Sequence, residues 1–283
     1  MKRVFFIFFL LAPIICGRPC FAAETACQVH PQIAWQGKTL AVKVPAEDVA
    51  SVSGIFLGQK FLCYKKGDVY KGIIGVPLDQ KPGYYKLKLF ITRTDGAKET
   101  RIKQLKVWST RFPYSKFWLP PARNKLRARQ IVNNEWALID KVLRQEATAQ
   151  RWQGKFIDPV TGEVSQGFGH KQIINGKAAG SHRGVDYTVI SGTEVIAPNN
   201  GKIVFADRLQ AFGGTMVLDH GQGIHTLYFH LSKMIAPVGQ EVKKGQVIAL
   251  SGNSGVSSGA HLHWGMSVHN LRVDPKQWVK YDI

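Results

Sequence analysis

The residues best suited to chemistry lie in the last third of the chain, where eight of its nine histidines follow residue 169. Five candidates occur in three short motifs, SHRGVD, LYFHLS and AHLHWGM. Two imidazoles and one carboxylate are a usual ligand set of a catalytic zinc site, which keeps one position open for water. Zinc lowers the pKa of that water and polarises a carbonyl, so hydrolysis is the expected reaction. The five candidates are His182, Asp186, His230, His261 and His263.

The spacing within two of these motifs favours a single shared site. One residue separates His261 from His263 in a β-prone run, and alternate residues of a strand point to the same face. Three residues separate His182 from Asp186, and Gly184 among them gives the backbone freedom to bring imidazole and carboxylate together. We therefore expect both pairs to face one metal ion.

The last third of the chain also resembles a known family. From about Phe156 to Val273 it is similar to the lysostaphin-type (LytM-like) zinc metallopeptidases, which cut peptide bridges in bacterial cell walls. The resemblance implies a zinc metalloendopeptidase that hydrolyses peptide cross-links of peptidoglycan, with Zn2+ as its cofactor. The motifs that carry it are FG at 168–169, NG at 175–176, HRGVD at 182–186, GTEVIAPNNGKIV at 192–204, TLYFHLS at 226–232, GQEVKKGQVIALSGNSG at 239–255 and GAHLHW at 259–264.

The resemblance implies roles for the five candidates as well. His182, Asp186 and His263 are expected to bind the metal, which leaves His261 and His230 as the catalytic pair. We predict that His261 is the general base and that His230 orients the water or stabilises the tetrahedral intermediate; the reverse division is the alternative. For His230 alone, a purely structural role is an equally good interpretation, because a single histidine on an apolar strand is often only hydrogen-bonded.

Other polar residues near these motifs are weaker candidates. His220 and His225 fall in a predicted turn, DHGQGIH, and are interpreted as structural, with positions lining the cleft or beside His230 as the alternatives. Many members of the family have arginine after the FG pair, where this chain has His170 and Lys171. Lys171 is the candidate replacement for that substrate-binding cation, although an amine does not reproduce the forked hydrogen bonding of a guanidinium.

Short β-branched and aromatic runs separated by glycine-rich turns predict an antiparallel sheet in this region. Two segments, 192–204 and 239–252, look like weak copies of one hairpin and are similar to the hairpins of lipoyl and biotinyl carrier domains. A cofactor carrier, modified on Lys243 or Lys244, is therefore a rival interpretation, but a carrier has no use for the histidine motifs. The predicted strands are 202–207, 215–220, 226–231, 246–250 and 261–268.

The first 23 residues are typical of a secretory signal, because Lys2 and Arg3 precede an apolar run from Val4 to Ile15 and small residues follow. The run is too short to span a bilayer, so we expect cleavage, no stable membrane insertion, and a periplasmic or secreted protein. Export would place Cys27 and Cys63 in an oxidising compartment. We predict a disulfide between them, and two buried free thiols are the alternative.

The chain is predicted to be mainly β, with two domains joined by a helical linker. Residues 24–110 alternate strand-like runs with turns, which predicts an immunoglobulin-like β-sandwich that is either a binding module or a spacer. Residues 111–155 form the linker, with one helix after Pro120 and Pro121, and residues 156–283 form the peptidase domain. The apolar face of the helix comprises Leu126, Val132, Trp136, Ile139 and Leu143. The opposite face, expected to be solvated, carries Arg127, Arg129, Lys141 and Arg144.

The formal charge of +19 at pH 7 restricts the possible partners. Nucleic acid would suit such a balance in the cytoplasm, but export argues against it. A basic exported protein is instead attracted to anionic envelope polymers, and the stem peptides of peptidoglycan carry free carboxylates. If the organism has two membranes, the preferred scissile bond joins D-alanine to a diamino acid, and an oligoglycine bridge is second. A catalytically inactive relative that activates a cell-wall amidase is a further alternative, which the complete ligand set disfavours.

Overall fold

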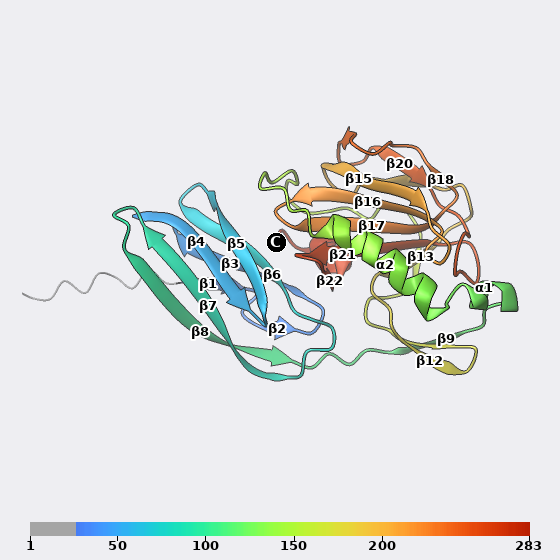
Figure 1. Cartoon of the computed structure of the whole chain (residues 1–283), viewed down its shortest axis with the longest axis horizontal. Coiled ribbons are helices and arrows are strands. Elements are labelled where there is room, and N and C mark those ends of the chain that lie inside the picture. The colour runs from blue at the N-terminus through green and yellow to red at the C-terminus, as the bar shows by residue number, and fades with distance from the viewer. Residues whose placement is uncertain (1–26) are drawn as a thin grey trace, which may run out of the picture.

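A computed structural model describes residues 27–283, and the predicted signal at residues 1–23 lies outside the described residues. The fold is mainly β, as predicted, with two β-rich bodies side by side and a linker that runs from the first to the far side of the second (Figure 1). In the described part of the chain, no helix is long and apolar enough to cross a membrane.

The N-terminal body is a single eight-stranded sheet in the order β1-β3-β6-β5-β4-β7-β8-β2. Alternation along its strands buries one face; in β7, for example, Leu87, Leu89 and Ile91 are buried while Lys86, Lys88 and Phe90 are exposed. The immunoglobulin-like topology stays a prediction. The strands are β1 Gln28–His30, β2 Ala34–Trp35, β3 Thr39–Pro45, β4 Val49–Phe56, β5 Gln59–Lys66, β6 Val69–Gly75, β7 Gly83–Arg93 and β8 Lys98–Trp108.

The disulfide predicted between Cys27 and Cys63 is not formed, because both residues are free thiols in the structure. Cys63 is buried in the core of the first sheet, and Cys27 packs against the same core. Burial raises the pKa of the Cys63 thiol to about 12, so this thiol is protonated and unreactive near neutral pH.

The linker contains a strand and two helices instead of the single helix that was predicted. Strand β9 Tyr114–Phe117 pairs in parallel with β11 Lys171–Ile174 of the second body. Helix α1 Pro121–Lys125 starts at the predicted proline, and α2 Arg129–Leu143 follows after a break. On α2 the predicted apolar face is buried at Ile139 and Leu143, and these side chains pack on Val217, Leu227 and Phe229 of the second body.

The C-terminal body is built on an antiparallel sheet in the order β10-β13-β21-β17-β16-β15-β19, with β22 beside β21. Four of the five strands predicted here lie in this sheet, whereas the fifth, 246–250, belongs to a smaller sheet with order β14-β20-β18. The remaining elements are β10 Glu163–Gln166, β12 Lys177–Ser181, β13 Val185–Thr188, β14 Glu194–Ile196, β15 Gly201–Arg208, β16 Gly214–Gly221, β17 Ile224–Leu231, β18 Lys233–Met234, β19 Glu241–Val242, β20 Val247–Leu250, β21 Leu262–Val268, β22 Leu271–Val273 and α3 Pro275–Lys280.

The two predicted hairpin copies pair with each other. Strand β14 of the first copy pairs with β20 of the second, and β15 pairs with β19. Each copy therefore contributes one strand to the large sheet and one to the small sheet, which explains why segment 246–250 leaves the sheet in which it was predicted.

The two bodies share a continuous core. Ala41 and Ile73 of the first sheet pack with Trp278, Met266 and Val273 of the second body in one buried cluster. Because apolar burial is the main favourable term in association, this cluster holds the N-terminal body against the face of the second body that carries α3.

Candidate active site

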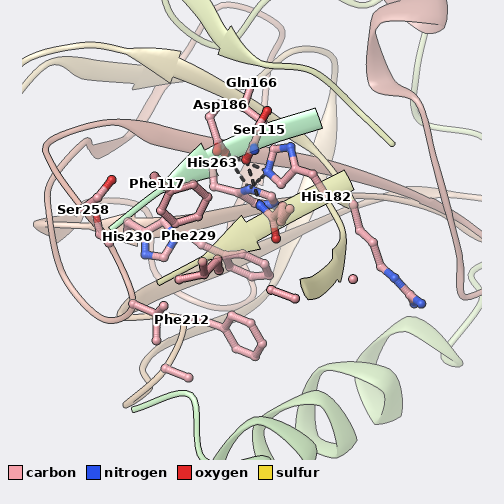
Figure 2. A pocket seen from close by; sticks show the side chains of 18 of the residues that line it. Ser115, Phe117, Gln166, His182, Asp186, Phe212, Phe229, His230, Ser258 and His263 are labelled. Carbon is pink, nitrogen blue, oxygen red and sulfur yellow. Dashed lines mark hydrogen bonds and ion pairs between the residues drawn. The ribbon is translucent and has the colours of Figure 1, made fainter. Parts of the chain in front are cut away.

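Three of the predicted ligands meet at one point. The Nε2 atom of His182 lies 2.9 Å from Nδ1 of His263 and 3.0 Å from Oδ1 of Asp186. The same carboxylate oxygen lies 2.8 Å from Nδ1 of His263. Figure 2 shows these contacts as dashed lines converging between the three side chains. Two imidazole nitrogens and one carboxylate oxygen thus present a compact donor set for a cation.

Strand pairing brings these residues together. Asp186 on β13 lies directly opposite His263 on β21, and His182 stands just before β13. The ring of Phe229, opposite His263 on β17, stacks on the His263 imidazole with centroids 5.0 Å apart and planes 5° apart. The stack and the cross-strand pair together orient the His263 ring toward Asp186.

Gly184 was expected to give the backbone freedom to turn, but its main contribution in the structure is the absence of a side chain next to His263. A Cβ atom at residue 184 would lie 2.6 Å from Nε2 and from Cε1 of the His263 ring. Any side chain here would therefore displace that imidazole. The requirement at residue 184 is space for the His263 ring.

The electrostatics of the three residues suit a divalent cation. Burial alone would raise the pKa of Asp186, but the adjacent His182 and His263 hold it well below its usual value. Burial lowers the pKa of His263, which favours the neutral, metal-binding form of the ring. Nδ1 of His182 lies 3.0 Å from the Gly167 carbonyl, so Nδ1–H donates to it and Nε2 keeps its lone pair for the site. The donor set therefore fits zinc, which prefers such nitrogen and oxygen ligands.

His230 and His261 stand together beside the three predicted ligands. Their ring centroids are 4.7 Å apart, and His230 lies 6.3 Å from His263 by the same measure. Nδ1 of His230 is 2.8 Å from the Ser254 carbonyl, and Nδ1 of His261 is 2.9 Å from the Gly259 carbonyl. Each ring therefore donates through Nδ1 and leaves Nε2 as the nitrogen available to water or substrate. Burial lowers the pKa of His230 to about 3, so this ring is neutral near pH 7.

The backbone at His230 is left-handed, and this conformation places its side chain in the same cavity as that of Phe229. Strand alternation would send Phe229 and His230 to opposite faces of the sheet. His230 instead has φ 63°, in the left-handed region, and both side chains line the same cavity. Such a conformation is costly for a residue other than glycine, and it is held here by a hydrogen bond from the His230 amide to the Phe212 carbonyl.

All five candidates line one cavity of about 1030 Å³ between the sheet and the linker. The linker contributes Phe117 from β9 and Trp136 from α2, and Figure 1 shows α2 lying across the sheet. Arg127 and Arg129, which were expected on a solvated face, also line the cavity. The two glycine-rich segments that flank it, 208–214 and 253–259, contribute further lining residues.

The weaker candidates fall outside this cavity. His220 and His225 lie on β16 and β17 and are fully buried in the domain, consistent with the structural interpretation. Lys171 does not replace the expected substrate-binding cation, since its amine lies over the Tyr114 ring, 5.5 Å from the centroid, and it is not among the residues that line the cavity. His170, the residue before Lys171, contacts the linker: its Nδ1 lies 2.8 Å from Oγ of Ser115.

The linker also contributes residues that sequence reasoning missed. The buried carboxylate of Glu135 accepts hydrogen bonds from the amides of Gln210, Ala211 and Phe212. The guanidinium of Arg123 donates to the carbonyls of Gly255 and Asn253. The position of Glu135 within the apolar face of α2, three residues after Val132, was the signal that could have identified it as buried and partnered.

Comparisons with known proteins match part of the C-terminal body to a known family. The sequence profile of Peptidase family M23 matches residues 180–275. The peptidoglycan DD-endopeptidase ShyB of Vibrio cholerae is 32% identical over 120 residues, which are 42% of this chain and 28% of that protein. The matched segments span only 20% to 33% of the length of the curated relatives.

Two solved structures resemble different portions of this chain. The catalytic domain of the antimicrobial peptidase lysostaphin from Staphylococcus simulans is 31% identical; the match covers 46% of this chain and 92% of that chain, with a TM-score of 0.34. A Pseudomonas aeruginosa protein described as a peptidase M23 is 24% identical, covers 90% of this chain and 97% of its own, and has a TM-score of 0.67. This second likeness extends the shared fold to both bodies.

Proposed function

Because the chain belongs to peptidase family M23, we propose that it is a zinc metalloendopeptidase that hydrolyses peptide cross-links of peptidoglycan. The observation that carries the proposal is the convergence of His182, Asp186 and His263, whose donor atoms lie within 4.8 Å of one another on the wall of a large cavity. The name of the DD-endopeptidase relative supports peptidoglycan as the substrate.

In this proposal His182, Asp186 and His263 hold the metal. A bound zinc ion supplies Lewis acidity, which polarises the scissile carbonyl and lowers the pKa of water. The carbonyl of Gly167 fixes the orientation of the His182 ring, and Phe229 fixes that of His263. Both rings are therefore preorganised, which limits the rearrangement needed at the site when substrate arrives.

His261 and His230 act on the attacking water. Since each ring donates Nδ1–H to a backbone carbonyl, each can accept a hydrogen bond at Nε2. We assign proton removal to His261 and orientation of the water to His230. A neutral His230 with this tautomer is an acceptor at Nε2, which favours the orienting role over donation to an oxyanion.

The cellular setting follows from the same substrate. Peptidoglycan lies outside the cytoplasmic membrane, so we propose that residues 1–23 direct export and that the protein acts in the periplasm or outside the cell. The basic charge of +19 would then retain it near anionic wall polymers. Residues 24–110, 111–155 and 156–283 are proposed as the accessory domain, the linker and the peptidase domain.

The test is digestion of purified wall sacculi with the purified protein. We expect new stem-peptide termini in the soluble products by mass spectrometry, loss of cleavage with a chelator, and recovery when zinc is added back. Intact sacculi after incubation with the zinc-loaded protein would contradict the proposal. If sacculi are cut only when a cell-wall amidase is also present, and only at the amidase bond, the amidase-activator alternative is correct.

A further inference from the structure

The linker reaches the glycine-rich loop at 253–259 through one side chain of helix α1. Arg123 donates from Nη1 to the Gly255 carbonyl at 2.5 Å and from Nη2 to the Asn253 carbonyl at 2.8 Å. Helix α1 buries none of its own residues, so packing does not explain its position beside this loop. The two hydrogen bonds of Arg123 join the helix to the loop instead.

The residue between those two carbonyls orients a histidine of the site. The carbonyl of Ser254 lies 2.8 Å from Nδ1 of His230. Three successive carbonyls are therefore shared between two partners, since the outer two accept from Arg123 and the middle one accepts from His230. The Nη groups of a guanidinium form a rigid planar fork, which fixes the two outer carbonyls relative to each other. With both of its neighbours fixed, the Ser254 carbonyl has little freedom to turn.

The loop needs such restraint because core packing does little to hold it. Within 253–259 only Ser257 is buried. A segment with little buried apolar surface opens at a low cost in free energy unless hydrogen bonds tie it to fixed groups. One such bond runs from the Val256 amide to the Ala211 carbonyl, and the Ala211 amide is itself bound by Glu135 of the linker. The linker thus restrains the loop directly through Arg123 and indirectly through Glu135.

The segment that carries Arg123 is anchored on both sides by contacts that do not involve the loop. Before α1, Leu119 is buried, and its amide and carbonyl bond to the side chain of Asn175 at 2.7 and 3.1 Å. After α1, helix α2 packs on the sheet through Ile139 and Leu143. The position of Arg123 is therefore set independently of the loop, so the guanidinium can determine where the loop lies.

We propose that Arg123 is a positioning residue for the peptidase reaction. Its guanidinium holds the backbone of residues 253–255, so that the Ser254 carbonyl keeps Nε2 of His230 directed at the attacking water. The inference rests on the proposed function and adds to it a residue outside the peptidase domain. It also gives the linker a part in catalysis, because a preorganised histidine needs no rearrangement when substrate binds.

The first test is Arg123→Ala in the full chain, with zinc content, kcat and KM measured on a synthetic cross-linked stem-peptide dimer. Because His230 loses its fixed orientation, kcat should fall by about 10–100-fold while KM stays within about 2-fold and zinc is retained. Arg123→Lys keeps the charge without the fork and should show a smaller loss. Lys125→Ala, at an exposed residue of the same helix, should match wild type. An unchanged kcat, a rise in KM alone, or loss of zinc in Arg123→Ala would overturn the proposal.

A double-mutant cycle then separates positioning from a general loss of structure. If Arg123 acts through His230, its removal has little left to disturb once that ring is absent. In a His230→Ala background, Arg123→Ala should therefore lower kcat by less than about 3-fold, because residues that act as a unit are not additive. Losses that multiply in the double variant would show that Arg123 does not act through His230, and the proposal would be rejected.

A failure of the proposed function is distinguishable from a failure of the positioning role. If the zinc-loaded wild type does not hydrolyse the dimer, the peptidase proposal is wrong, and NMR spectroscopy tests the positioning without catalysis. The buried Nδ1–H of His230 should give a slowly exchanging proton signal, which is assigned by its absence in His230→Ala. Loss of this signal in Arg123→Ala, with the signal retained in Lys125→Ala, supports the positioning. An unchanged signal in Arg123→Ala rejects it.

Discussion

Both carboxylate oxygens of Glu135 lie 3.0 Å from the backbone nitrogen of Ala211. The same carboxylate also accepts from the amides on either side, at Gln210 and Phe212. The Phe212 carbonyl in turn accepts the amide of His230. A buried side chain of the linker is therefore connected through two hydrogen bonds to the backbone of a proposed catalytic histidine.

Removing the Glu135 carboxylate should weaken catalysis without removing zinc. Glu135→Ala leaves three loop amides without their acceptor, so we expect unfolding free energy to fall by about 1–3 kcal/mol. Movement of His230 should lower kcat by up to about 100-fold at unchanged zinc content. Glu135→Gln keeps one carbonyl oxygen and should show a smaller loss, and Glu194→Gln, on an exposed carboxylate, serves as the control. A Glu135→Ala variant with wild-type kcat would refute this connection.

The proposed division between metal ligands and the catalytic pair predicts different phenotypes for two neighbouring histidines. His263→Ala removes a donor that lies 2.8 Å from Asp186 and 2.9 Å from His182, so both zinc content and hydrolysis should be lost. His261→Ala should keep zinc while kcat falls by about 10²–10⁴-fold, the usual contribution of a general base. Elemental analysis of the purified variants, paired with kcat, checks both. Equal loss of zinc in the two variants would reject the division.

His220 predicts an acid-dependent loss of stability that is separate from catalysis. It is fully buried, with Nδ1 2.7 Å from the Asn200 carbonyl and Nε2 2.9 Å from Oγ1 of Thr226, and burial lowers its pKa to about 3. An unfolded histidine takes up a proton near pH 6.5. Between about pH 6.5 and 3 the unfolded chain therefore binds a proton that the folded chain does not. Stability should fall as the pH falls through this window, by about 1.4 kcal/mol per pH unit from this residue.

The comparison of His220→Gln with wild type isolates that contribution. Urea unfolding at pH 6.5, 5.5 and 4.5 should show a pH slope smaller by about 1.4 kcal/mol per unit in the variant, although its stability at pH 6.5 is reduced. His30→Gln, at an exposed histidine of the first sheet, should leave the slope unchanged. Equal pH slopes of the unfolding free energy for wild type and His220→Gln would mean that His220 is not the source of this pH dependence.

Local spacing was sufficient to predict which residues meet in the candidate site. His182 with Asp186, and His261 with His263, are close in sequence, so strand alternation and a short turn bring each pair to the same cavity. The class of the fold could also be predicted, because β-branched runs between glycine-rich turns need no distant contact to be recognised. Strand 246–250 was assigned to the wrong sheet because only the pairing of two distant hairpins decides it.

The contributions of the linker could not be predicted in the same way. The parallel pairing of β9 with β11, and the contacts of Glu135 with the loop at 210–212, join segments more than fifty residues apart. The left-handed backbone of His230 likewise depends on the Phe212 carbonyl and not on its own residue type.

The contact between the two bodies predicts that they unfold together. The side-chain amide of Gln277, at the start of α3, donates to the Thr39 carbonyl at 2.9 Å and accepts the Thr39 amide at 2.7 Å. All these groups are buried, so Gln277→Ala leaves both backbone groups of Thr39 without a partner and should cost about 1–3 kcal/mol. Wild type should show a single calorimetric transition, and the variant a lower Tm or two separated transitions. As a matched control, Gln240→Ala, in a turn of the second body, should leave the wild-type profile unchanged. Two separated transitions already in wild type would show that the shared core does not couple the bodies.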